Sequence, residues 1–190
     1  MMKTTNIMIV GVGGQGSLLA SKLMGRLLVD EGYDVKVSEV HGMSQRGGSV
    51  VTYVRFGDRV HSPIIDKGEA DFIISFEKIE AARYAEYLSE GGRIIVNTQQ
   101  IEPMPVITGA AEYPVDALDK LSKVGIDVIS LDALSLATEA GSSKAVNIVL
   151  MGVLSRYMSI SEDKWISAIE KSVAPKFVEM NTKAFKLGRN

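Results

Sequence analysis

The sequence predicts an α/β fold of the Rossmann-like type, with three layers, a mixed and mostly parallel sheet that contains one β-hairpin, and a helical C-terminal part. Three observations predict it. Short apolar runs alternate with segments of helical periodicity, a glycine-rich turn follows the first run, and an alternating stretch near residue 50 leads into a tight turn where a helix would otherwise follow. Residues 1–190 are expected to form a single domain, because no linker, repeat or low-complexity tract interrupts them.

A strand–helix–strand unit is expected to open the chain. Residues 7–10 form a continuous apolar run directly before glycines, which is typical of a buried parallel strand. Leucines recur at helical spacing over residues 17–30, and Gly32 follows as a helix end. A second strand is expected over residues 35–40, so the unit predicts the beginning of a βαβ arrangement.

Residues 49–64 are expected to form a β-hairpin. The stretch "VVTYVRF" alternates as a sheet strand does, and Gly57 with Asp58 offers a tight turn into the second arm, "RVHSPII". This hairpin would place antiparallel strands in the sheet.

The rest of the chain again alternates between strands and helices. Residues 143–158 are apolar on nearly every helical face, so this helix must be buried in the fold or in an interface with a partner. Ser161 is expected to cap a helix, and Gly91, Gly92 and Gly188 to follow helix ends. The expected strands are residues 70–76, 93–97 and 126–132, and the expected helices are residues 78–89, 115–123, 143–158, 162–173 and 175–187.

Composition narrows the class of partner and the cellular location. The formal net charge is −2, from 21 basic and 23 acidic residues, so neither nucleic acid nor an anionic membrane is the expected partner. The longest near-apolar run, residues 148–154, is far shorter than the roughly 20 residues that span a bilayer. The first six residues show no signal-peptide pattern, and a cytoplasmic protein is therefore expected.

The chain contains no cysteine and only two histidines, His41 and His61. Disulfides, thiolate-held iron–sulfur clusters and thiol nucleophiles are therefore excluded within this chain. Neither histidine lies in a ligand-spaced cluster with carboxylates, so no metal site is expected.

The glycine-rich turn "GVGGQG" is the first candidate binding site. Its backbone N–H groups and the following helix N-terminus suit an anion, and Glu39 stands where a ribose-binding acid would be expected. A stand-alone NAD(P)-dependent dehydrogenase is therefore one hypothesis, and glycines that merely permit close strand–helix packing are another. The candidate cofactor-binding residues of the turn are Gly11, Gly13, Gly14, Gln15 and Gly16.

A second glycine-rich stretch, "HGMSQRGGS", describes an exposed loop at the end of the second strand. Arg46 can present a forked donor to a phosphate or a carboxylate, although a solvated loop arginine is the simpler interpretation. Ser44 and Ser49 have no identifiable base nearby in the sequence, so neither is expected to act as a nucleophile. Both glycine loops follow strands at their carboxyl ends, and they are expected to lie side by side at one crevice.

Five segments together resemble a known family, the gamma domain of 2-oxoacid:ferredoxin oxidoreductases. They are "GVGGQG", "EVHGMSQRGGSV", "SPII", "EADFIISFEKIEAARY" and "KAVNIVLMGVL", and a sixth segment, the terminal "NTKAFKLG", resembles the family as well. The resemblance spans almost the whole chain. Within the family, the sequence most resembles the small (beta) subunit of the indolepyruvate enzymes. Two glycine loops in this order are far more specific than a lone G-x-G-x-x-G pattern.

The resemblance implies an accessory subunit that has no catalytic residue of its own. The family oxidatively decarboxylates a 2-oxoacid with coenzyme A, which gives an acyl-CoA, carbon dioxide and reduced ferredoxin. By resemblance, thiamine diphosphate, its Mg²⁺ and the iron–sulfur clusters belong to a larger catalytic subunit, ferredoxin is met through the complex, and the substrate is indolepyruvate or another aryl pyruvate.

The same resemblance implies roles for the two loops. The glycine turn and Arg46 are expected to contact coenzyme A or the larger subunit, and Glu39 is not expected to be a ribose ligand. The dehydrogenase and a nucleotide-sensing module stay open as alternatives. The expected interface residues are His41, Gly42, Met43, Ser44, Gln45, Gly47 and Gly48.

Overall fold

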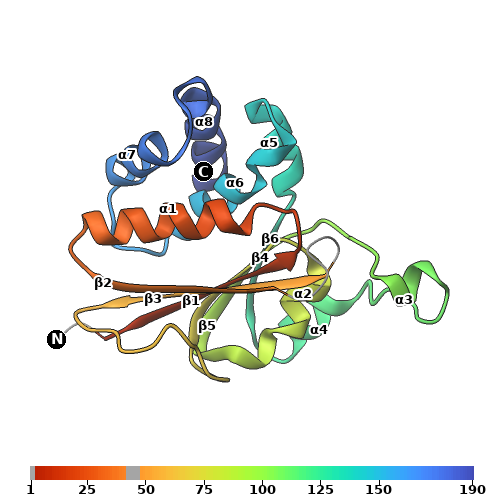
Figure 1. Ribbon diagram of the computed structural model, residues 1–190. Coiled ribbons are helices and arrows are strands. Elements are labelled where there is room, and N and C mark those ends of the chain that lie inside the picture. The colour runs from red at the N-terminus through yellow and green to blue at the C-terminus, as the bar shows by residue number, and fades with distance from the viewer. Residues whose placement is uncertain (1–2, 42–47) are drawn as a thin grey trace.

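The structure is a computed structural model that describes residues 3–41 and 48–190, and this part of the chain forms a six-stranded sheet in the order β2-β3-β1-β4-β5-β6 (Figure 1). β3 is antiparallel to both of its neighbours, β2 and β1, whereas β1, β4, β5 and β6 pair in parallel. The strands are β1 (Thr5–Val12), β2 (Asp34–His41), β3 (Ser49–Gly57), β4 (Ala70–Ser75), β5 (Leu88–Asn97) and β6 (Asp127–Leu131).

Helices cover both faces of the sheet, so the molecule has three layers (Figure 1). One face carries α1 (Ser17–Asp30), α5 (Ala133–Ala140), α6 (Val146–Ser155), α7 (Glu162–Ser172) and α8 (Val178–Arg189); the other carries α2 (Lys78–Arg83) and α4 (Ala117–Lys123); and α3 (Met104–Ile107) projects beyond the sheet. Short 3₁₀ turns lie at Ala85–Tyr87, Ser143–Ala145 and Pro175–Phe177. In the described residues no helix is both long enough and apolar enough to cross a membrane.

The central strand β1 supplies apolar side chains to both faces of the sheet. Ile7 and Ile9 belong to the hydrophobic cluster that includes α1 and α6, whereas Met8 and Val10 belong to the cluster on the α2 and α4 side. This alternation follows from the two-residue period of a strand. All four side chains are fully buried, which explains the unbroken apolar run in the sequence.

The α/β class, the mixed sheet and the helical C-terminal part are confirmed, but the expected hairpin over residues 49–64 is wrong in its second arm. β3 pairs with β2 and β1, so both of its edges are occupied and none is free for residues 59–64. Those residues instead form an irregular segment after β3, without strand or helix. Arg55 binds this segment by donating hydrogen bonds to the carbonyls of Ser62 (3.2 Å) and Ile64 (2.5 Å).

The helix expected over residues 78–89 is shorter than predicted, because α2 ends at Arg83 and residues 88–92 belong to β5. Gly92 was expected to follow a helix end but lies within the strand. A Cβ atom there would come within 2.8 Å of the Ala70 carbonyl oxygen, so the close approach of β4 requires glycine.

The C-terminal helices are largely confirmed, and α6 is buried inside the fold at every one of its positions. Gly188 was expected to mark the helix end, yet α8 continues to Arg189 and Gly188 faces α6. Ser161 does occupy the N-cap position of α7, without a side-chain hydrogen bond to the helix. The sequence had not indicated α5, which follows β6 directly.

Candidate functional site

The glycine turn connects β1 to α1 and has a backbone that two glycines make possible. Gly14 has a φ of 98° and Gly16 a φ of 90°, both in the left-handed region that side chains disfavour. A Cβ atom on Gly11 would lie 2.9 Å from the Gln15 side chain and 3.0 Å from Phe76, so close packing also requires glycine there. Gly14 has no heavy atom within 4 Å of such a Cβ position, and its outer side is open.

Gln15 joins the turn to the neighbouring strands. Its Oε1 accepts a hydrogen bond from the Val12 N–H at 2.7 Å, and its Nε2 donates to the Phe76 carbonyl (3.2 Å) and to Gln99 Oε1 (3.4 Å). The side-chain amide therefore points into the fold and stabilises the turn.

The second glycine loop ends beside the first. β2 ends at His41, and β3 begins with Ser49 opposite Val12 of β1. The Gly13 N–H donates a 2.9 Å hydrogen bond to the Gly48 carbonyl, which joins the two loops directly. Most of the contact residues predicted for this loop lie outside the described part of the chain. They are Gly42, Met43, Ser44, Gln45, Arg46 and Gly47, together with the side chain of His41.

Glu39 lies near the turn although β3 separates its strand from β1. It lines a pocket of about 310 Å³ with Gly13, Gly14, Gly16 and Ser17 at the start of α1. The Thr52 hydroxyl on β3 donates to its carboxylate at 3.3 Å. On the other side of the turn, a second pocket of about 560 Å³ is lined by the turn and by residues near α5 and α6, Gln99, Leu134, Lys144 and Asn147 among them.

Sequence reasoning missed two buried carboxylates at the same edge of the sheet. Glu77 follows β4 and is 1% exposed, and one of its oxygens accepts hydrogen bonds from the N–H groups of Ile79 (2.6 Å) and Glu80 (3.1 Å). Its other oxygen accepts from the Ile101 N–H at 3.2 Å and from the Tyr113 hydroxyl. Burial, and then this bond to the carboxylate, raise the pKa of Tyr113 above its ordinary value. The position of Glu77 just before a helical segment was the available signal, since it is an N-cap position.

Glu80 is the second buried carboxylate, and it is 5% exposed. It accepts a hydrogen bond from the Ser49 hydroxyl and another from Arg83 Nε at 3.2 Å. The Tyr84 hydroxyl lies 3.2 Å from the same serine oxygen. Ser49 had no visible partner in the sequence, and the fold brings this carboxylate to it from 31 residues away.

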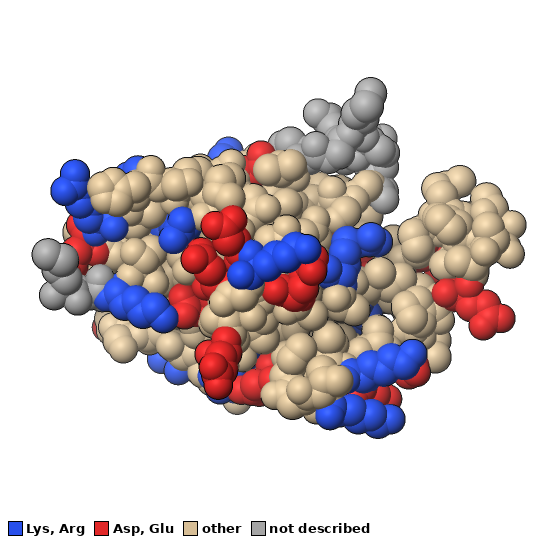
Figure 2. Space-filling view, turned by 90° about the horizontal axis from the view of Figure 1, so that it is seen from below, with Lys and Arg blue, Asp and Glu red and all other residues tan. Residues whose placement is uncertain are grey.

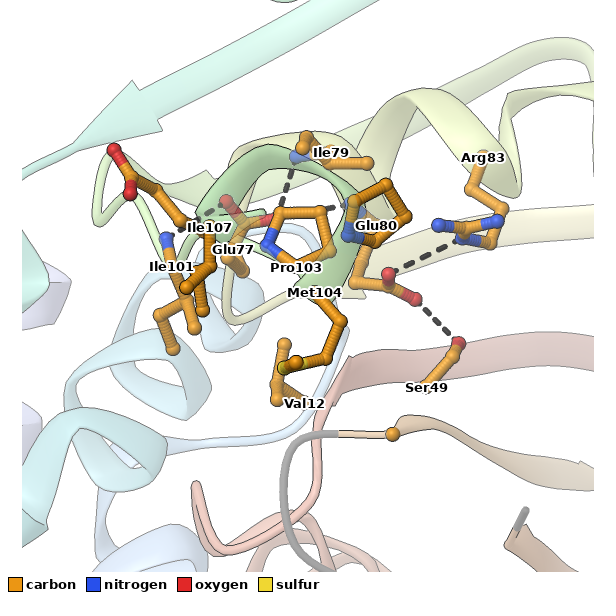
Figure 3. A pocket seen from close by; sticks show the side chains of 13 residues that line it. Val12, Ser49, Glu77, Ile79, Glu80, Arg83, Ile101, Pro103, Met104 and Ile107 are labelled. Carbon is orange, nitrogen blue, oxygen red and sulfur yellow. Dashed lines mark hydrogen bonds and ion pairs between the residues drawn. The ribbon is translucent and has the colours of Figure 1, made fainter. Parts of the chain in front are cut away.

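These polar groups border a pocket of about 430 Å³ between the sheet edge and α3 (Figure 3). Glu80 and Arg83 lie at one end of it, whereas Ile101, Pro103 and Met104 form an apolar wall. Within the described residues, no group of three or more His, Cys, Asp or Glu side chains could hold a metal ion. The pocket combines an apolar wall with polar side chains, so it can bind an amphipathic surface or ligand.

Comparison with known proteins gives a consistent result. The family model described as pyruvate ferredoxin/flavodoxin oxidoreductase matches residues 6–190. The chain is 45% identical to the indolepyruvate oxidoreductase subunit IorB of Thermococcus kodakarensis, over 98% of this chain and 95% of that protein. It is 25% identical to the ketoisovalerate oxidoreductase subunit VorA of Methanothermobacter marburgensis, over 98% of this chain but only 36% of that longer protein.

Solved structures share the fold. The gamma subunit of a keto/oxoacid ferredoxin oxidoreductase from Geobacter sulfurreducens is 23% identical with a TM-score of 0.72, over 97% of this chain and 96% of that one. The 2-oxoglutarate:ferredoxin oxidoreductase of Magnetococcus marinus, solved with 2-oxoglutarate, coenzyme A and succinyl-CoA bound, is 19% identical with a TM-score of 0.75, over 98% of this chain and 30% of that one. Together, the family match over residues 6–190 and the identity to IorB show that this chain belongs to the pyruvate ferredoxin/flavodoxin oxidoreductase family.

Proposed function

We propose that the chain is the accessory subunit of a thiamine-diphosphate-dependent 2-oxoacid:ferredoxin oxidoreductase that acts on indolepyruvate or another aryl pyruvate. The observation that carries the proposal is the 45% identity to IorB over nearly the full length of both chains. The two glycine loops, which the fold joins through Gly13 and Gly48, lie within the matched region.

The redox cofactors belong, in this proposal, to a larger partner subunit. Iron–sulfur clusters are held by cysteine thiolates, and this sequence has no cysteine, so its residues do not fit such a cluster. In the described residues, no three or more His, Cys, Asp or Glu side chains come together as a metal-binding group. The chain's own contribution is a shaped surface at the carboxyl edge of the sheet. Electrons pass to ferredoxin through the complex, and we place the complex in the cytoplasm, which cell fractionation with immunodetection would test.

We further propose that residues 1–190 act as one domain, supported by the family match over residues 6–190 and by two hydrophobic clusters that share one sheet. The glycine turn and the loop with Arg46 would then meet coenzyme A or the larger subunit.

The experiment is reconstitution of the full chain with the larger subunit, followed by assay of a panel of 2-oxoacids for acyl-CoA formation and ferredoxin reduction. Activity should require both subunits and should favour aryl pyruvates. Failure of the two subunits to associate would contradict the proposal.

The role of Arg46 is tested in the same complex. Loss of a charge-assisted hydrogen bond costs about 1.5–3 kcal/mol, so Arg46→Ala should weaken assembly, or raise the KM for coenzyme A, by roughly ten- to a hundred-fold. Arg59→Ala is a matched control, because Arg59 is exposed and follows the C-terminal end of β3, at the other end of the strands from the glycine loops. Wild-type behaviour of Arg46→Ala would leave this residue without the proposed role.

A nicotinamide-dependent dehydrogenase is the second candidate, and the pocket that Glu39 shares with the glycine turn favours it. We propose that Glu39 does not hold a ribose, because β3 is inserted between β1 and β2 and so interrupts the dinucleotide-binding arrangement. Titration of the chain with NADH, followed by fluorescence, tests this. Micromolar binding that Glu39→Ala abolishes would reverse the order of the two functions.

A further inference from the structure

An uncharged arm projects from the molecule beside the candidate site. Residues 103–111, "PMPVITGAA", carry no charged side chain, although Glu102 and Glu112 flank them. Figure 1 shows α3 standing clear of the sheet, and Figure 2 shows an uncharged lobe on the same side, next to acidic side chains. Met104 is 66% exposed and Ile107 is 61% exposed. Contiguous exposed apolar side chains are a feature of surfaces that bind other molecules.

The arm is folded before any partner arrives. Pro105 accepts hydrogen bonds from the N–H groups of Ala110 (2.8 Å) and Ala111 (3.0 Å), and Met104 accepts one from Thr108 (2.9 Å). Pro103 and Pro105 each fix a φ angle in this stretch. A preformed arm loses little conformational entropy when it binds.

Both ends of the arm are attached to one buried group, Glu77. The same carboxylate oxygen accepts from the Ile101 N–H, just before the arm, and from the Tyr113 hydroxyl, just after it. Because the other oxygen caps α2, the arm is tied to the body of the sheet. Its apolar side chains therefore stay outside the core of this chain.

The space between the arm and the body is the 430 Å³ pocket, and it is continuous with the two glycine loops. Met104 and Ile107 line it from the arm, whereas Val12 and Gly48 line it from the loops (Figure 3). The arm, the pocket and the proposed interface thus form one surface at one edge of the sheet.

We propose that residues 103–111 and this pocket clasp an apolar patch of the larger catalytic subunit. This inference rests on the proposed function and names a docking surface for it. In VorA the matching region is about a third of a longer chain. Here the match covers 95% of IorB, and in this proposal the neighbour is a separate subunit that meets the surface. Uncharged, preorganised apolar side chains are what the central part of such an interface requires.

The test measures binding of the purified full chain to the purified larger subunit by biolayer interferometry. Met104→Glu/Ile107→Glu should weaken binding by about thirty-fold or more, because both side chains would be central contacts. Val124→Glu is the matched control: Val124 is 75% exposed but follows α4, outside the arm, and this variant should bind as wild type does. Circular dichroism should show the same fold for all three proteins.

Hydrogen exchange gives a second measurement that needs no substitution. Amides of residues 103–111 should exchange more slowly in the complex than in the free chain. Equal binding of all variants, or unchanged exchange, would overturn the docking surface and leave the proposed function in place. If the wild-type chain itself does not bind, both fall. If the double variant lost only self-association in sedimentation, a second copy of the chain would be the occupant and the proposal would be wrong.

Discussion

Gln15 shows how one side chain sets the shape of the glycine turn. The residue was expected to contact a cofactor or a partner, and in the structure its amide joins the end of β1 to residues just after β4 and β5 through three hydrogen bonds. The glycines give the backbone freedom, and Gln15 selects one conformation from it. The turn therefore has a fixed shape, in which the N–H groups of Val12, Gly13 and Gln15 are already bonded within the protein.

Gln15→Ala should lower the free energy of unfolding by about 1–3 kcal/mol, because the two shorter of these hydrogen bonds contribute roughly 0.5–1.5 kcal/mol each. Urea denaturation of the variant and the wild type measures the change. Gln100→Ala is the matched control, since Gln100 is exposed and should alter stability by no more than about 0.5 kcal/mol. A Gln15→Ala protein as stable as this control would show that the turn keeps its shape without the amide.

The residues of the site were only partly predictable from the sequence. Glycine positions with positive φ, and the adjacency of two loops at strand ends, follow from local rules. The bonds from Glu77 to Tyr113 and from Glu80 to Ser49 join residues 36 and 31 positions apart. Such pairs depend on how β3, α2 and the arm come together, which no local pattern encodes.

At the scale of elements, the packing of α6 against α8 depends on two glycines. A Cβ atom on Gly152 would lie 2.1 Å from the Phe185 carbonyl oxygen, and one on Gly188 would lie 2.0 Å from that of Val149. The two helix backbones are therefore in direct contact. This explains why α8 continues through Gly188, which a sequence rule had assigned to a helix end.

Gly152→Ala should destabilise the protein by about 3 kcal/mol or more, because the added methyl group must separate two buried helices. Gly25→Ala is the same substitution in another helix, and it should have the opposite effect on stability. Gly25 lies in α1, and its Cβ position has only Val37 nearby, at 3.8 Å, so alanine should stabilise the helix by up to about 1 kcal/mol. Thermal unfolding of both variants measures the contrast; a Gly152→Ala protein as stable as wild type would contradict the close contact.

Asp132 caps α5 and makes its stability depend on pH. The Ser135 hydroxyl (2.6 Å) and N–H (3.0 Å) donate to its carboxylate and hold the pKa of Asp132 below its ordinary value. Because the pKa is lowered in the folded state, the charged carboxylate stabilises the protein above the unfolded pKa of about 3.9. This stabilisation is lost as the pH falls through the lower folded value.

The Tm difference between wild type and Asp132→Ala should therefore be constant from about pH 7 to pH 5 and should narrow below about pH 4. Asp132→Asn retains a capping oxygen without the charge, so its own difference from Asp132→Ala should not change with pH. Melting curves across this pH range distinguish the two effects.

The elements themselves were mostly predictable where periodicity was long, as in α1, whose bounds match the prediction at both ends. Prediction was wrong where a strand had two possible partners. β3 was expected to pair with residues that follow it, but it pairs along its length with β2 and β1. Its pairing with β1 runs from Thr5 opposite Phe56 to Val12 opposite Ser49. Pairing between distant strands overrode the local turn signal at Gly57 and Asp58.

At the scale of the whole molecule, the residues that stabilise the fold and the residues proposed for binding lie in different parts of the sheet. Its two hydrophobic clusters lie above and below the strands, whereas the glycine loops, Glu77, Glu80 and the arm gather at the carboxyl edge. Changes at that edge can therefore alter binding without unfolding the core. This arrangement suits a subunit whose chemistry is completed by a partner.

The purified chain alone should consequently be colourless, contain no stoichiometric iron and oxidise no 2-oxoacid. A chain without cysteine has no thiolates to hold a cluster, and the proposed active site lies mainly in the larger subunit. Metal analysis and visible absorption of the chain, alone and after reconstitution, measure the first two properties, and ferredoxin reduction measures the third. The reconstituted complex is the control, because colour, iron and activity should appear together when the larger subunit is added. Iron at one or more atoms per chain, or turnover by the chain alone, would show that the catalytic machinery lies at least partly within these 190 residues.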